Sequence, residues 1–393
     1  MKFDYIKQNL IIVFSSIFAG ICNWLFGYLV IKLFHADDIA IFYGFAGLVG
    51  LLSLPSIWIT YITTSHGKEV AVLLKQKFLG VNLLVFSITL TIFLFIFTEL
   101  TNNFVYFSLI ALVLVSSFIS AYYRGLLQNQ LKFFLLGNII IVENIFKISI
   151  LIIFFYFNVY PLAAIFAYVI QTISTTIVLK YYTNNIQTKI NKDVIKKTAM
   201  YTLYFSVGVV CFTNMDVVFA RSFLNVGENT QYIVLIQIVK LLIFPSIAIV
   251  SGLYSNLSKK PDIKSILKMS LVSFLFITFG FVVLISTILF KFQLISMLFN
   301  IEISNKYFTE LMLIFGYLYS LSLILMNLLL VRRGKYLGII VISNVVIQSL
   351  LYIYFARYLY QFVMIYGISS VLTFCSCLLV LIAVAYKKKK LQL

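Results

Sequence analysis

The sequence predicts an all-α polytopic membrane protein, with about twelve transmembrane helices in two parallel six-helix lobes. Three observations predict this class. Hydrophobic residues make up 62% of the 393 positions, charged residues only 11%, and the mean hydropathy is +1.06. Apolar runs of roughly 20 residues, the length that spans a bilayer, follow one another along the chain. The two halves of the chain also resemble each other. Soluble globular domains do not have this composition, so a soluble enzyme is excluded.

The apolar runs predict the spans in order along the chain. They lie near residues 8–33, 39–64, 78–98, 103–123, 133–157, 160–182, 200–222, 229–254, 267–290, 308–331, 337–357 and 360–386. The first run is too long for the core of a signal peptide, so we expect it to be retained as a helix.

The loops between these spans alternate in charge. Most of the 30 basic residues lie in one set of loops and at the two termini, whereas the other set contains stretches such as HADD and NVGENT. By the positive-inside rule the basic set faces the cytoplasm, and an even number of spans places both termini there. The formal net charge of +18 is therefore a topology signal, and we expect no nucleic-acid partner.

An internal repeat joins two stretches about 190 residues apart. Residues 23–59 contain PSIWI at Pro55, and residues 214–249 contain PSIAI at Pro245. Further matches at the same offset begin at Asn23. Both copies start on the same side of the membrane, which predicts lobes of residues 1–198 and 199–393 related by a pseudo-twofold axis along the membrane normal.

Parallel lobes of this kind are typical of transporters, in which the substrate path lies between the halves and one half rocks against the other. A proline inside a helix removes a hydrogen bond and bends the helix. Pro55 and Pro245 occupy matching positions in the second and eighth spans, so they are candidate hinges. A static kink at each proline is the alternative.

Ionisable residues inside an apolar span mark the candidate site. Glu143 and Lys147 lie four residues apart in the span at 133–157, near the membrane midplane. A charged side chain at that depth costs about 2.5–3.5 kcal/mol, so we expect both residues to face the bundle interior. They form either a self-compensating structural pair or one wall of a polar cavity.

Other polar side chains extend this candidate site through the bundle. Lys240 lies near the middle of the eighth span, and Asp216 lies in the outer part of the seventh. The remaining candidates are Asn23, Arg124, Arg221, Gln237, Asn344 and Gln348. For Arg221, snorkelling to the membrane surface is the alternative. A cavity lined by cations suits an anion such as a lipid-linked pyrophosphate, which Lys and Arg bind well.

The sequence contains no catalytic or metal-binding motif. The two histidines, His35 and His66, lie at loop ends, and Gly67-Lys68 lacks the glycine spacing of a nucleotide-binding loop. We therefore expect no enzyme activity, no cofactor and no bound metal. Energy for transport would come from an ion gradient, the membrane potential or consumption of the substrate on the far side.

Three stretches resemble a known family. Residues 122–148, YYRGLLQNQLKFFLLGNIIIVENIFKI, resemble the Arg-Gly-x-Leu-Gln…Phe…Leu-Gly…Glu region of polysaccharide flippases. Residues 214–245 resemble their seventh-to-eighth-span signature of Asn-x-Asp, a cation, an acidic residue and Tyr. LISMLFN with Tyr307 resembles their ninth-to-tenth-span connector, although Asn300 stands where relatives often carry glycine. The chain is thus similar to the O-antigen and capsule repeat-unit flippases of the multidrug/oligosaccharidyl-lipid/polysaccharide (MOP) superfamily.

This resemblance implies movement of an undecaprenyl-pyrophosphate-linked oligosaccharide from the cytoplasmic to the periplasmic leaflet of a bacterial inner membrane. Lys147, Lys240 and Arg221 would hold the pyrophosphate, while Glu143 and Asp216 would balance these charges or carry a coupling proton. We expect a monomer that works beside a glycan polymerase and a chain-length regulator. A cation-coupled drug antiporter of the same fold is the alternative, and a membrane glycan polymerase or acyltransferase is a third.

Overall fold

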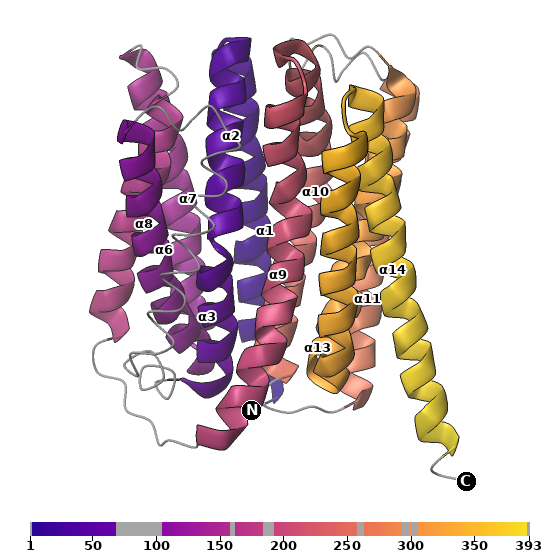
Figure 1. Cartoon of the computed structure of the whole chain (residues 1–393). Coiled ribbons are helices and arrows are strands. Elements are labelled where there is room, and N and C mark those ends of the chain that lie inside the picture. Colours follow the sequence, from indigo (N-terminus) through magenta and orange to yellow (C-terminus); the bar gives the residue numbers. More distant parts are fainter. Residues whose placement is uncertain are drawn as a thin grey trace.

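The structure, a computed structural model, describes residues 2–67, 104–157, 162–183, 192–257, 263–291, 297, 299 and 305–390. Every regular element among these residues is an α-helix, and the helices stand side by side in one bundle (Figure 1). In chain order they are α1 (Lys2–Leu33), α2 (Ala36–Leu52), α3 (Leu54–His66), α6 (Phe104–Asn129), α7 (Phe133–Tyr156), α8 (Leu162–Thr183), α9 (Lys192–Phe223), α10 (Val226–Leu257), α11 (Ile263–Lys291), α13 (Lys306–Phe355) and α14 (Leu359–Lys390).

The described helices include nine segments that are long and apolar enough to cross a membrane, and the bent pair α2–α3 adds a tenth. Two of the nine, Lys306–Leu330 and Tyr336–Phe355, belong to α13. The first helix adds a shorter apolar stretch, Ile17–Leu33. The predicted span at 78–98 lies outside the described residues. The predicted all-α, polytopic class is confirmed.

Several predicted spans differ from the helices. The spans predicted at 308–331 and 337–357 belong to one helix, α13. The span at 39–64 is broken at Ser53 into α2 and α3, which are bent by 41°. Pro55 lies in the first turn of α3, where a missing backbone N–H is tolerated, so the hydrogen-bond ladder of α2 ends here. The span predicted at 103–123 continues to Asn129 as α6, so Arg124 lies within the helix.

Contacts between the two halves follow the internal repeat. The repeat aligns α1 with α9 and α2 with α10. In the bundle α1 packs on α10, and α2 packs on α9, so the two contacts are equivalent under a twofold rotation. Contacts within the halves obey the same rule, since α3 on α6 corresponds to α10 on α13. The bundle therefore consists of two lobes, while the boundary between residues 198 and 199 stays a prediction.

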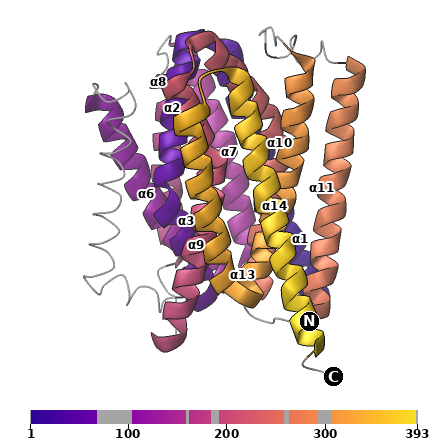
Figure 2. The ribbon, with the colours of Figure 1, turned by 45° about the vertical axis from the view of Figure 1, so that its right-hand side comes forward.

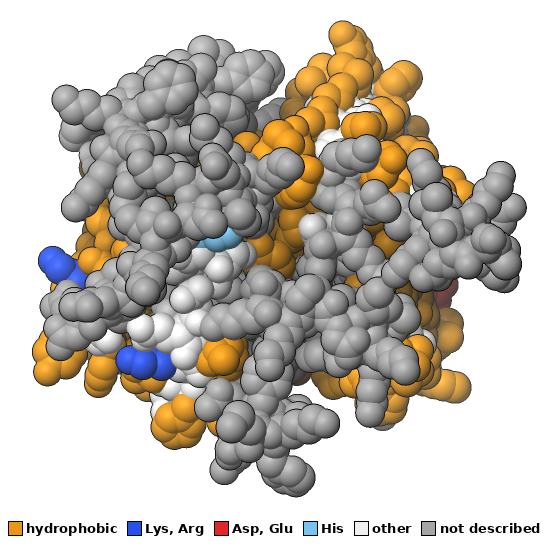
Figure 3. Space-filling model, turned by 90° about the horizontal axis from the view of Figure 1, so that it is seen from below, with side chains coloured by type: hydrophobic (Ala, Val, Ile, Leu, Met, Phe, Trp, Pro, Cys, Tyr) orange, Lys and Arg blue, Asp and Glu red, His pale blue; other side chains and the backbone are white. Residues whose placement is uncertain are grey.

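The flanks of the bundle are apolar. In α11 only 17% of the Leu271–Phe290 span is buried inside the protein, which leaves its large side chains for lipid tails. Figure 2 shows α11 at the edge of the bundle. Both α1 and α14 have their terminal ends at the same end of the molecule (Figure 1). Figure 3 views that end, with hydrophobic side chains over much of the described flank.

Gly125 allows α6 to approach α3 closely. A Cβ atom at this position would lie 2.6 Å from Thr63 Cβ and 2.9 Å from the backbone oxygen of Thr60. We expect Gly125→Ala to destabilise the protein by about 1–3 kcal/mol, because the two helices must separate. Thermal unfolding of the purified protein in detergent measures this change.

Gly280 is the matched control for Gly125. It lies within α11, and a Cβ there would meet only Leu242 Cδ2, at 3.6 Å. Replacing this glycine with alanine removes the entropy cost of a helical glycine, so Gly280→Ala is expected to be neutral or stabilising. Equal melting temperatures for the two variants would contradict the close α3–α6 packing.

Candidate functional site

A cavity of about 590 Å³ lies between the two halves of the bundle. Helices α1, α2, α3, α6, α7 and α8 line it from the first half, and α9, α10 and α14 line it from the second. Its charged lining residues are Arg124, Glu143, Lys147 and Lys240. The structure therefore brings together four charged residues that lie up to 116 positions apart in the sequence.

Glu143 lies near the middle of α7 and pairs with a cation from a neighbouring helix. Its two carboxylate oxygens accept hydrogen bonds from Arg124 Nη2 of α6 at 2.8 and 2.6 Å. The hydroxyl of Thr175, on α8, donates a third bond at 2.9 Å. Glu143 of α7 is therefore held by side chains from two neighbouring helices, α6 and α8. The structural pair is Arg124–Glu143 rather than Glu143–Lys147.

Lys147, one turn further along α7, is 1% exposed and has a different environment. Its ammonium group donates a hydrogen bond to Asn23 Oδ1 of α1. It also lies 4.8 Å from the ring centroid of Phe26 and 4.7 Å from that of Tyr168. Desolvated cation–π contacts of this kind contribute about 2 kcal/mol. Among the described residues Lys147 forms no ion pair with a carboxylate, so its positive charge is not neutralised directly.

Lys240 lines the same cavity from α10, in the second half. Its ammonium group lies 5.8 Å from the ring centroid of Tyr43, a residue of α2. Gln237, one turn before Lys240, donates a hydrogen bond to the Tyr43 hydroxyl. Gly27 of α1 leaves room for this contact, because a Cβ there would lie 2.7 Å from the Tyr43 oxygen. Gln237 does not line the cavity. Its hydrogen bond to Tyr43 connects the two halves of the bundle beside Lys240.

Asp216 lies on α9 and is fully buried, away from the cavity lining. It accepts a hydrogen bond of 2.7 Å from the hydroxyl of Tyr232, and it interacts electrostatically with Lys240. Asp216 also interacts electrostatically with Tyr366, a second residue of the cavity lining. No group of three or more His, Cys, Asp or Glu among the described residues could hold a metal ion.

The remaining polar candidates lie apart from the cavity. Asn344 and Gln348 are buried on α13, and the Asn344 amide donates to Thr373 Oγ1 of α14 at 3.4 Å. Residues 338–348, GIIVISNVVIQ, also resemble residues 137–147, GNIIIVENIFK, so that Asn344 and Gln348 align with Glu143 and Lys147. Asn344 and Gln348 pack inside the second half. Arg221 is in the last turn of α9.

The two candidate hinge prolines differ in their surroundings. Pro55 follows the break between α2 and α3, whereas Pro245 lies inside α10, which continues through it as one helix. The repeated motif therefore has two local geometries. A hinge role for either proline stays a prediction.

Uncharged polar residues also line the cavity, and the sequence reasoning missed them. Tyr168, Gln171 and Thr172 come from α8, and Ser117 and Gln128 come from α6. The spacing of the first three residues, i, i+3 and i+4, places them on one face of a helix. This polar face, inside the otherwise apolar span at 160–182, was the feature of the sequence that could have indicated their place in the cavity.

Solved structures with this fold are membrane transporters. The chain superposes on an outward-facing multidrug resistance MATE family transporter of the MOP superfamily with a TM-score of 0.62 and 14% identity, over 98% of this chain and 96% of that one. A MATE protein in complex with MaD5 gives a TM-score of 0.61 and 13% identity, over 97% and 96% of the two chains.

A third structure is a MOP superfamily transporter from Pyrococcus furiosus, with a TM-score of 0.58 and 12% identity over 95% of each chain. No protein family profile and no curated protein matches the chain. At these identities the likeness concerns the fold. The chain has the all-α, two-lobe fold of these transporters.

Proposed function

We propose that this chain is a membrane transporter that moves an undecaprenyl-pyrophosphate-linked oligosaccharide across the bilayer by alternating access. The net positive charge of the cavity supports this proposal. Three cations and one carboxylate line the cavity, and the carboxylate of Glu143 is engaged by Arg124. Lys147 and Lys240 are therefore the two cations available to an anionic ligand, and pyrophosphate is an anion that lysine binds well.

The positions of the two lysines suggest how a ligand would act on the lobes. Lys147 belongs to the first half and Lys240 to the second, so a bound pyrophosphate would contact both. The present contacts of these lysines, with Asn23 and with the Tyr43 ring, are weaker than charge-assisted hydrogen bonds to phosphate. A ligand that exchanges them stabilises one arrangement of the lobes over another, as alternating access requires.

A cation-coupled antiporter of small compounds is the second candidate. It is favoured by the Glu143 carboxylate on the cavity lining and by the likeness to a transporter described as multidrug resistance. In that case Glu143 and Asp216 would bind the cation. The Pyrococcus furiosus transporter is described as having a binding pocket of reversed polarity, which suggests a different function for it. The charge of the ligand that the cavity prefers, anionic or cationic, is therefore the property that distinguishes the two candidate functions.

The proposed cellular setting combines the loop charges with the family resemblance. The basic loops favour both termini in the cytoplasm, in accord with the shared end of α1 and α14 (Figure 1). The resemblance to polysaccharide flippases implies a bacterial inner membrane. The chain would act as a monomer in O-antigen or capsule synthesis, where a glycan polymerase and a chain-length regulator would be its functional partners.

Deletion of the gene in the bacterium that carries it tests the proposed function. We expect loss of surface glycan and accumulation of lipid-linked repeat units that an external probe does not reach. The wild-type chain should restore surface glycan, and Lys240→Met should not, because one of the two available cations is lost. The measurement is glycan on intact cells, together with protein level in membranes. Unchanged glycan combined with raised sensitivity to cationic drugs would favour the antiporter instead.

A further inference from the structure

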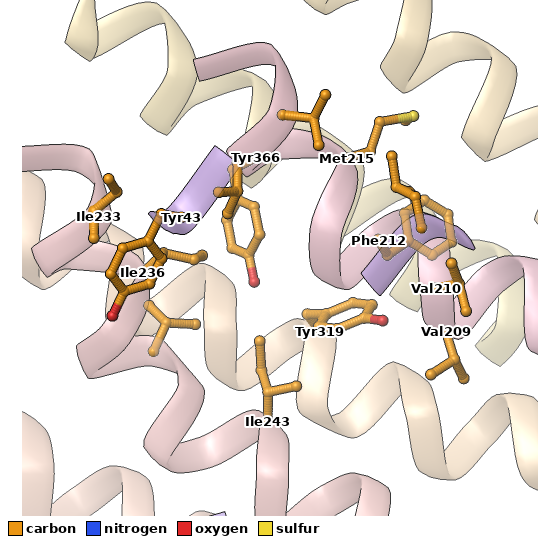
Figure 4. Packing of buried hydrophobic residues seen from close by; sticks show 14 of the residues in the cluster. Tyr43, Val209, Val210, Phe212, Met215, Ile233, Ile236, Ile243, Tyr319 and Tyr366 are labelled. Carbon is orange, nitrogen blue, oxygen red and sulfur yellow. The ribbon is translucent and has the colours of Figure 1, made fainter. Parts of the chain in front are cut away.

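The two walls of the cavity differ in chemistry. The wall formed by α6, α7 and α8 carries hydroxyl and amide groups beside its charges. The wall formed by α9 and α10 is mainly apolar, with Phe212, Ile236 and Ile243 among its residues. Figure 4 shows these three residues in one cluster of buried hydrophobic side chains, with Ile236 beside Tyr43. A ligand in this cavity would therefore meet hydrogen-bonding groups on one side and aliphatic surface on the other.

Part of the polar chemistry on α6 and α8 holds these helices together. Ser116 donates to Thr172 Oγ1 at 3.0 Å, and Thr176 donates to the backbone oxygen of Ser116 at 2.9 Å. Hydroxyl groups in membrane helices commonly serve such packing. These bonds account for the packing of α6 against α8 and engage Thr172, but they do not involve the side chains of Gln171 and Ser117, which also line the cavity.

The cavity side retains free hydrogen-bonding capacity. The Gln171 amide and the Ser117 hydroxyl line the cavity, and neither forms a side-chain hydrogen bond within the described part of the chain. Gln128 accepts a bond from Thr64 and keeps its amide donors available. An amide presents both donors and an acceptor, and a hydroxyl presents one donor and two lone pairs. Groups of this kind on an internal wall match a neutral ligand rich in hydroxyls.

We propose that the α6–α8 wall is a carbohydrate subsite, at which Gln171 and Ser117 hydrogen-bond the sugars next to the pyrophosphate. The proposal rests on the proposed function and deepens it. Lys147 and Tyr168 lie at the same wall, so a pyrophosphate at Lys147 places the adjoining sugar beside Gln171, one helical turn from Tyr168. The Tyr168 ring offers an apolar face with a polar tip, which suits the two faces of a sugar ring.

Binding to two lipids tests this subsite. Purified full-length protein in lipid nanodiscs is titrated with undecaprenyl pyrophosphate and with the same lipid carrying the host oligosaccharide. We expect wild type to bind the sugar-bearing lipid about tenfold more tightly, because several neutral hydrogen bonds are added. Gln171→Leu should remove most of this preference and leave the affinity for the sugar-free lipid within about twofold. Ser117→Ala should reduce the preference in the same direction.

Two further variants separate the subsite from general effects. Ser149→Ala removes an exposed hydroxyl elsewhere on α7 and should leave both affinities unchanged. Lys240→Met should weaken both lipids equally, because it acts on the shared pyrophosphate. Equal binding of the two lipids by wild type, or a preference that survives both Gln171→Leu and Ser117→Ala, overturns the carbohydrate subsite and leaves the proposed function standing. Binding of neither lipid by wild type overturns the proposed function as well.

Discussion

Lys147→Met is expected to abolish transport while leaving the protein folded. Lys147 is the more deeply buried of the two lysines that we assign to the pyrophosphate, and no described carboxylate pairs with it. Losing one charge-assisted hydrogen bond to phosphate lowers affinity by about 10- to 100-fold. The measurement is binding of undecaprenyl pyrophosphate to the purified variant, together with glycan on intact cells.

The same variant, Lys147→Met, is expected to keep or gain folding stability although it loses transport. Burying a cation at this depth costs about 2.5–3.5 kcal/mol, which the rings of Phe26 and Tyr168 offset only in part. Methionine fills a similar volume without this cost, although Asn23 loses its donor. We expect the melting temperature of Lys147→Met to equal or exceed that of wild type, a combination of lost function and retained stability that marks functional residues.

Lys32→Met is the matched control for this prediction. Lys32 is an exposed lysine in the last turn of α1 that also contacts an aromatic ring, that of Tyr28 at 5.6 Å. Its replacement should change neither lipid affinity nor surface glycan. A Lys147→Met variant that transports normally, or one that fails only because it does not fold, would remove Lys147 from the proposed site.

The fold was predictable because it depends on properties that are summed over many residues. Apolar runs and alternating loop charges define the spans without knowledge of any single contact. The repeat around Pro55 and Pro245 went further, since it predicted equivalent contacts for the two halves, and α1 on α10 and α2 on α9 obey this rule. A bend at Pro55 was predicted, but the division of this span into two helices at Ser53 was not, and the same motif continues as one helix at Pro245.

The sequence predicted which charged residues line the cavity, but it did not predict which side chains they contact. Glu143, Lys147 and Lys240 were expected inside the bundle because their charges require it, and all three line the cavity. The partner of Glu143 depends on how α6 and α8 are rotated beside α7, which spacing along one helix does not determine. Gln171 was missed because an uncharged amide in an apolar span gives a weak signal next to the charged residues.

The Arg124–Glu143 pair should tolerate loss of both charges better than loss of one. The Glu143 side chain is 6% exposed and that of Arg124 is 28% exposed. Removing one partner of a buried ion pair leaves an uncompensated charge, which costs about 3–5 kcal/mol. We therefore expect Arg124→Gln and Glu143→Gln each to lower the melting temperature and the level of protein in the membrane.

The double variant Arg124→Gln/Glu143→Gln separates the structural role of this pair from a direct role in substrate binding. It leaves the net charge of the cavity unchanged, because one cation and one anion are removed together. We expect it to recover most of the stability lost in the single variants and to retain transport, since Lys147 and Lys240 still supply the positive charge. Additive losses of stability would show that the two side chains do not compensate each other. A stable double variant without transport would instead place Arg124 in direct contact with the substrate.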